Sequence, residues 1–113
     1  METRKNRKHE IVCMTVKSRT ETEISPEFEV AIKKIVEGDN RRLLLDLSAL
    51  KYLKSSQLRV ILNAVKEIDR KSGKVVLCSL NAYVKEVFEV NCHKDIIAIA
   101  DSVEAGFNAL LYV

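Results

Sequence analysis

The chain has 113 residues, of which 47% are hydrophobic and 31% charged, and it carries a formal net charge of +3 at pH 7. This length fits one domain with a single core, and the even spread of apolar residues excludes a disordered chain. No apolar run approaches the roughly 20 residues that a membrane-spanning helix needs, and the basic start lacks the apolar stretch of a secretory signal. We therefore expect a single cytoplasmic domain, residues 1–113, without direct membrane insertion.

The excess positive charge lies at the N-terminus. Arg4, Lys5, Arg7 and Lys8 are opposed there only by Glu2, and acidic and basic residues balance over the rest of the chain. A neutral body with a short basic arm attracts a phosphate backbone weakly, so we expect no nucleic-acid partner. The arm, residues 1–9, is predicted to be a solvated tail or a frayed edge strand.

The first half of the chain begins with a strand and a helix. Residues 11–16 are short, β-branched and apolar, which is typical of a strand. Ser25 and Pro26 then suit the N-cap and first position of a helix, which ends at Gly38. Residues 43–47 are apolar on both faces, which indicates a strand buried in a parallel or mixed sheet.

A loop at 48–54 separates that strand from a second helix. The helix follows the tandem pair Ser55 and Ser56, and we expect one of these serines to be its N-cap. Apolar residues recur on one face of the helix, which is predicted to end near Gly73.

The remaining elements alternate in the same way. Residues 74–79 predict a strand, 82–90 a helix and 96–99 a final strand. Asp101, with Glu104 three residues later, is the arrangement of a capping box at the start of a last helix.

This order predicts an α/β fold, with a mixed sheet of four to five strands and about four helices. Its crossovers are long enough to join parallel neighbours. Right-handed crossovers place the loops that follow the strands along one edge of the sheet, where partners of such sheets usually bind. The loop at 48–57 lies at that edge.

The cysteines favour neither a metal site nor a disulfide framework. Cys13, Cys78 and Cys92 are far apart, and Cys92 with its neighbour His93 has no second ligand pair at zinc spacing. Cys13 and Cys78 lie in apolar runs, so we interpret them as reduced core residues. We expect no metal and no cofactor.

Enzyme motifs are likewise missing from the sequence. There is no glycine-rich phosphate loop, and Asp46 lacks the acidic pair that a phospho-accepting receiver domain needs. Ser55 has no GxSxG elbow and no histidine placed by pattern to activate it. We therefore expect a protein that is not an enzyme.

The segment LLLDLSALKYLKSSQLRVILNAVKEI, residues 43–68, resembles the core motif of the STAS domain, especially that of bacterial anti-sigma factor antagonists. Later segments are similar too, namely SGKVVLCSLNAYVKEVFEV and IIAIADSVEAGFNALL, so the resemblance covers residues 11–111. The positions that match the core motif are Asp46, Leu47, Ser48, Ser55, Ser56 and Leu58.

The resemblance implies a partner-switching regulator of transcription. In this family, the unphosphorylated antagonist binds an anti-sigma factor serine kinase and frees the sigma factor. The kinase then phosphorylates a serine at the helix start, the complex separates, and a phosphatase resets the antagonist. Carried over to this sequence, the phospho-acceptor is Ser55, with Ser56 as the alternative. The partner-binding residues implied are Lys54, Ser55, Ser56, Gln57, Leu58, Ser18, Arg19, Thr20, Glu21, Thr22 and Glu23.

Three positions or segments depart from the family pattern. Lys54 replaces an acidic residue, and residues 18–23 (SRTETE) replace a glycine-acidic-leucine-aspartate stretch. Gln57 replaces a glycine, and we expect its side chain to stand on the first helical turn where a partner approaches. An inverted surface charge should select a different partner.

The alternative function is a non-phosphorylated STAS scaffold subunit of a membrane transport or lipid-transport assembly. A basic N-terminal arm near a membrane would favour it mildly. Neither the sigma pathway nor the oligomeric state is indicated by the pattern.

Overall fold

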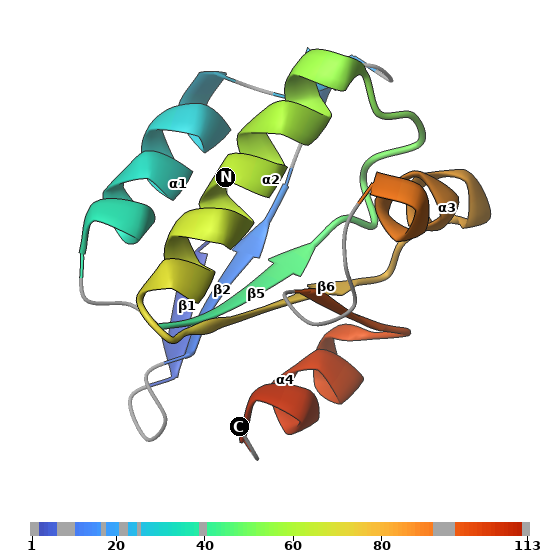
Figure 1. Ribbon diagram of the computed structural model, residues 1–113. Coiled ribbons are helices and arrows are strands. Elements are labelled where there is room, and N and C mark those ends of the chain that lie inside the picture. The colour runs from blue at the N-terminus through green and yellow to red at the C-terminus, as the bar shows by residue number, and fades with distance from the viewer. Residues whose placement is uncertain are drawn as a thin grey trace.

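A five-stranded sheet lies at the centre of the computed structural model, which describes residues 3–6, 11–16, 18–20, 23–24, 26–38, 41–91 and 97–111 (Figure 1). The strands, in their order across the sheet, are β1 (Thr3–Asn6), β2 (Ile11–Thr15), β5 (Arg42–Asp46), β6 (Lys74–Cys78) and β7 (Ile97–Ala100). β1 is antiparallel to β2, and the other neighbours are parallel. The predicted mixed sheet is confirmed, and β1 adds an edge strand from within the basic arm.

Helices cover both faces of this sheet. They are α1 (Pro26–Glu37), α2 (Ser55–Arg70), α3 (Ala82–Asn91) and α4 (Val103–Leu111). α1 and α2 lie side by side on one face, and α4 packs on the other face against β5 and β6 (Figure 1). None of the helices in the described part of the chain is both long and apolar enough to cross a membrane.

The apolar character of β5 on both faces follows from this layering. Leu43 and Leu45 point into the larger core, which lies under α1, α2 and α3, and Leu44 points into the smaller core under α4. Since successive side chains of a strand alternate between faces, a central strand covered twice has to be apolar throughout.

Two buried cysteines belong to the smaller core. Cys13 and Cys78 are both reduced thiols there. Burial, followed by the nearby Asp46 carboxylate, raises the pKa of the Cys78 thiol to about 11, so the thiol stays protonated at neutral pH. Their interpretation as core residues is confirmed, while Cys92 lies outside the described residues.

The segment between β2 and α1 contains a short antiparallel ribbon of β3 (Ser18–Thr20) and β4 (Glu23–Ile24). Of the partner-binding residues expected here, Glu21 and Thr22 lie outside the described residues, as does the expected N-cap Ser25.

The predicted cap of the last helix is wrong by one residue. The Oγ atom of Ser102 accepts a hydrogen bond from the Ala105 N–H at 3.1 Å. Because α4 begins at Val103, the N-cap position is Ser102, and Asp101 lies one residue too early to reach the first turn. The sequence offered two adjacent capping residues, and the helix start decides between them.

Candidate partner-docking site

The candidate site is the loop between β5 and α2, at the edge where the parallel strands end. The ladder continues one residue past β5, with the Leu47 N–H donating to the Cys78 carbonyl at 3.0 Å. The chain then turns, because the Oδ1 atom of Asp46 accepts a hydrogen bond from the Ser48 N–H at 3.0 Å. β3 follows β2 at the same edge, so the two predicted partner-binding segments leave neighbouring, directly paired strands.

The loop is held both by buried leucines and by hydrogen bonds from a side chain at the start of α3. Leu50 and Leu53 are buried in the larger core. The Nδ2 atom of Asn81 donates to the Lys51 carbonyl at 2.9 Å and to the Leu50 carbonyl at 3.4 Å. The backbone of the loop is therefore fixed to the start of α3 as well as to its own neighbours, since the Leu50 N–H donates to the Leu47 carbonyl at 3.0 Å.

Asn81 was not singled out from the sequence. Its Oδ1 atom accepts a hydrogen bond from the Val84 N–H at 2.8 Å, which makes it the N-cap of α3. An asparagine directly before a predicted helix is a usable sign of that cap. Its bond to a loop 30 residues earlier has no local sequence signal.

The first turn of α2 corrects two expectations. Lys54, with extended backbone at φ −83° and ψ 159°, occupies the N-cap position, so neither Ser55 nor Ser56 is the cap. The Lys54 N–H donates to the Oε1 atom of Gln57 at 2.8 Å. The Gln57 side chain is only 7% exposed, so it turns inward as half of a capping box instead of standing out toward a partner.

The physical reason is the point at which the helix begins. A serine caps a helix only from the position before its first turn, and Ser55 and Ser56 already lie within that turn. A lysine side chain has no acceptor for the first-turn N–H groups, so the reciprocal bond from the third helical position is the one that stabilises this end.

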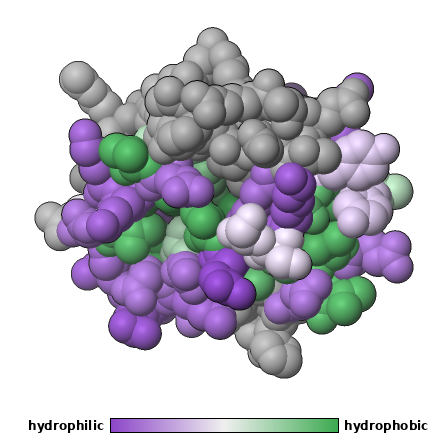
Figure 2. All heavy atoms as spheres, turned by 90° about the horizontal axis from the view of Figure 1, so that it is seen from above, coloured by the Kyte–Doolittle hydropathy of each residue, from purple (hydrophilic) through white to green (hydrophobic). Residues whose placement is uncertain are grey.

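Both serines are consequently exposed at the surface. The first backbone hydrogen bond of the helix runs from the Leu58 N–H to the Lys54 carbonyl, at 2.9 Å. The N–H groups of residues 55–57 therefore precede the helical hydrogen-bond ladder. The first turn contains no acidic residue, and the positive end of the helix dipole is therefore not compensated there. Figure 2 looks down on the end of the molecule where α2 begins, and shows hydrophilic side chains with hydrophobic ones between them.

The other residues predicted in this segment divide by burial. Lys54 is exposed beside the serines, whereas Leu58 is half-buried and packs against the larger core. The structure thus brings Lys54, Ser55 and Ser56 together at the surface.

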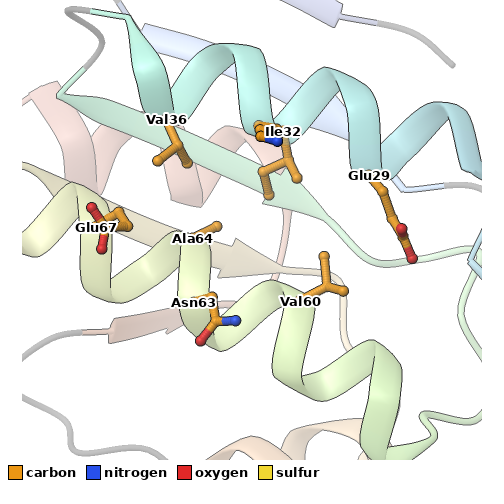
Figure 3. A pocket seen from close by; sticks show the side chains of 8 residues that line it. Glu29, Ile32, Val36, Val60, Asn63, Ala64 and Glu67 are labelled. Atoms are coloured by element: carbon orange, nitrogen blue, oxygen red, sulfur yellow. The ribbon is translucent and has the colours of Figure 1, made fainter.

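A separate cleft of about 390 Å³ lies between α1 and α2 (Figure 3). Ile32 and Val36 of α1 face Val60 and Ala64 of α2 across it, and charged side chains stand at its rim (Figure 3). The residues that line the cleft include no histidine, cysteine or serine.

Comparisons with known proteins agree with the geometry. The model of the STAS domain family matches residues 2–106. A protein of Bordetella bronchiseptica named as an anti-sigma factor antagonist, BtrV, is 38% identical over 80 residues, which cover 71% of this chain and 69% of the relative.

Solved structures resemble the whole chain. An anti-sigma factor antagonist domain from Planctomyces limnophilus superposes with a TM-score of 0.76, at 18% identity, over 98% of this chain and 95% of the other. The Bacillus cell fate determinant SpoIIAA in its phosphorylated form gives a TM-score of 0.66, at 14% identity, over 89% of this chain and 92% of the other. These similarities confirm the predicted fold.

Proposed function

Because the chain belongs to the STAS domain family, we propose that it is an anti-sigma factor antagonist that is controlled by serine phosphorylation. In its unphosphorylated form it binds an anti-sigma factor kinase in the cytoplasm. The kinase then transfers the γ-phosphoryl group of ATP to Ser55, and the complex separates. A phosphatase restores the binding form. The name of the Bordetella relative and the phosphorylated form of SpoIIAA support this proposal.

The observation that carries the proposal is the exposure of the serines at the start of α2. Because Gln57 caps the helix, the hydroxyls of Ser55 and Ser56 are not needed for capping and face solvent. Ser55 is the first residue of the helix and the proposed acceptor, with Ser56 as the alternative.

Electrostatics explains how phosphorylation can leave the fold intact. A phosphate adds about −1.5 to −2 charges at neutral pH, and a helix N-terminus favours an anion through its N–H groups and its dipole. Lys54 lies directly before Ser55 and offsets part of the added charge. Phosphorylation therefore changes mainly the charge of the docking surface, from positive to negative.

The proposed docking surface consists of the exposed residues Lys54, Ser55 and Ser56, with Gln57 and Leu58 holding the first turn from the inside. The ribbon of residues 18–20 and 23–24 supplies its second part from the neighbouring strand. We place no catalytic residue in this surface, so the protein acts by binding.

The test compares Ser55→Asp with Ser55→Ala. Isothermal titration against an anti-sigma factor kinase from the same genome should show at least a tenfold weaker affinity for Ser55→Asp, equivalent to about 1.4 kcal/mol, because a permanent anion stands in the interface. Its free energy of unfolding in urea should change by less than about 0.5 kcal/mol, since the helix start tolerates an anion.

Intact-mass spectrometry after incubation with the kinase and ATP supplies the control. The wild type should gain one phosphate and Ser55→Ala none. Phosphate on Ser56 in the wild type would move the acceptor by one residue. Equal affinity of Ser55→Asp and wild type, with no phosphate gained by either serine, would contradict the proposed switch.

A further inference from the structure

Two exposed tyrosines contact each other beside the proposed acceptor serine. Tyr52 lies in the loop three residues before Ser55, and Tyr83 lies in the first turn of α3. Their ring centroids are 5.8 Å apart, with the planes at 66°, an edge-to-face arrangement. Tyr52 is 49% exposed and Tyr83 is 51% exposed, so each residue presents about half of its surface to solvent.

Few large hydrophobic side chains are exposed among the residues that the structure describes. In the part of the chain that the structure describes, the large hydrophobic side chains classed as exposed are Val30, Tyr52, Tyr83 and Val90. The two tyrosines are the members of this group that lie at the carboxyl edge of the sheet, where both proposed partner-binding segments begin. Tyrosine is enriched among the residues that dominate binding energy at protein interfaces, because it combines a large apolar area with a polar hydroxyl.

The two rings are also held in place before any partner arrives. Leu53, the residue after Tyr52, anchors the loop in the core. Asn81, two residues before Tyr83, donates a hydrogen bond to the loop backbone at the Lys51 carbonyl. Contact with each other restricts both rings further. A surface that is ordered in the free protein loses little conformational entropy on binding, so most of its contact energy contributes to affinity.

The charge of the loop and of the first turns of α2, beside Tyr52, has one sign. Residues 47–59 contain three charged side chains, all of them basic (Lys51, Lys54 and Arg59), and no aspartate or glutamate. Residues 10–113 as a whole contain equal numbers of basic and acidic side chains, so this segment concentrates positive charge beside Tyr52. The complementary surface on a partner is acidic.

We propose that Tyr52 and Tyr83 form an aromatic anchor that, together with Lys54, docks onto an acidic protein surface containing an apolar recess. This inference rests on the proposed function, because the partner that carries the acidic surface is the anti-sigma factor kinase. It extends the docking surface from α2 across the loop to α3. The tyrosines supply affinity, and the lysine supplies orientation and the association rate.

The test is the affinity of the same kinase, from the same genome, for Tyr52→Ala and Tyr83→Ala. Each variant should bind at least tenfold more weakly than the wild type, and Tyr83→Phe, which keeps the ring, should stay within about threefold. The matched control is Val30→Ala, which removes an exposed apolar side chain from α1 and should leave the affinity unchanged. Circular dichroism and urea unfolding show that each variant is folded, and wild-type binding should weaken as salt is added.

The outcomes separate this inference from the function beneath it. If Ser55→Asp weakens binding while both alanine variants bind like the wild type, the aromatic anchor is wrong and the phospho-switch stands. If the wild type binds no anti-sigma factor kinase of its genome, the proposed function fails, and the anchor fails with it. If sedimentation shows a wild-type dimer that Tyr83→Ala dissociates, with kinase affinity unchanged, the occupant of this surface is a second copy and the proposal is overturned.

Discussion

Lys54 occupies the N-cap position of α2, but its side chain cannot accept the hydrogen bonds that the first-turn N–H groups offer. An N-cap residue stabilises a helix by accepting hydrogen bonds from first-turn N–H groups, and an ammonium group has no acceptor to offer. Gln57 supplies the half of the capping box that is left. The N-cap position thus carries a basic side chain that does not serve the cap, and we assign it to binding.

We therefore predict that Lys54→Asp stabilises the fold and weakens docking at once. An aspartate at the N-cap would complete the capping box with Gln57 and interact well with the helix dipole, raising the free energy of unfolding by about 0.5–1 kcal/mol. It would also place an acid against the acidic partner surface. Urea unfolding and titration with the kinase measure the two effects.

Lys66→Asp is the matched control, since it makes the same charge change in the interior of α2, far from the first turn. Aspartate is a poorer helix former than lysine, so this variant should be less stable than the wild type. A loss of stability in Lys54→Asp as well would show that the cap is already complete without an acceptor at position 54.

At the scale of the element, the turn between α2 and β6 has two separate steric requirements, one at Ser72 and one at Gly73. Ser72 has a left-handed backbone with φ of 64°, a conformation that favours glycine. Gly73 is required for a different reason, because a Cβ atom there would lie 2.4 Å from the Arg41 carbonyl oxygen and 2.7 Å from Cγ2 of Ile68. The close approach brings the end of α2 against the start of β5.

Substitution at the two positions should accordingly affect the free energy of unfolding differently. Gly73→Ala should lower the free energy of unfolding by about 1–3 kcal/mol, because backbone has to move to make room for the methyl group. Ser72→Gly should not lower it, because glycine adopts the left-handed conformation without strain. Urea unfolding of both variants is the measurement, and equal losses in the two would show that the turn tolerates no change at all.

The elements themselves were predictable because their signals are local. Helical spacing of apolar residues and short β-branched runs gave the four helices and the parallel strands to within one or two residues. The ends of elements were less predictable. Ser55 was an equally good cap or first helical residue in the sequence, and only the position where α2 begins distinguishes the two.

Side-chain contacts between distant segments could not be predicted from the sequence. The Nζ atom of Lys71, at the end of α2, donates to the carbonyls of Val36 and Gly38, with 2.7 Å to the second of these, and so satisfies the end of α1. The contact between Tyr52 and Tyr83 is of the same kind. Neither has a spacing or motif, because the fold alone brings the residues together.

At the scale of the whole molecule, the docking surface is separate from the two cores but depends on connections between elements. The sheet and its helices are stabilised by apolar packing on both faces, and the candidate site occupies only the edge where the strands end. What positions the site is the link from the loop after β5 to the start of α3, where the side chain of Asn81 donates hydrogen bonds to the carbonyls of Leu50 and Lys51.

Asn81→Asp tests this link without removing the helix cap. The carboxylate can still accept the hydrogen bond from the Val84 N–H, but it has no N–H to donate to the carbonyls of Leu50 and Lys51. We expect hydrogen exchange at the Leu50 amide to become faster while the amide of Lys85, in the first turn of α3, stays protected. Asn81→Ala removes both functions, so both amides should exchange faster.

Kinase affinity should fall in both variants, because the loop that carries Tyr52 and leads to Ser55 is no longer ordered before binding. Unchanged exchange at Leu50 in Asn81→Asp would mean that the buried leucines alone hold the loop.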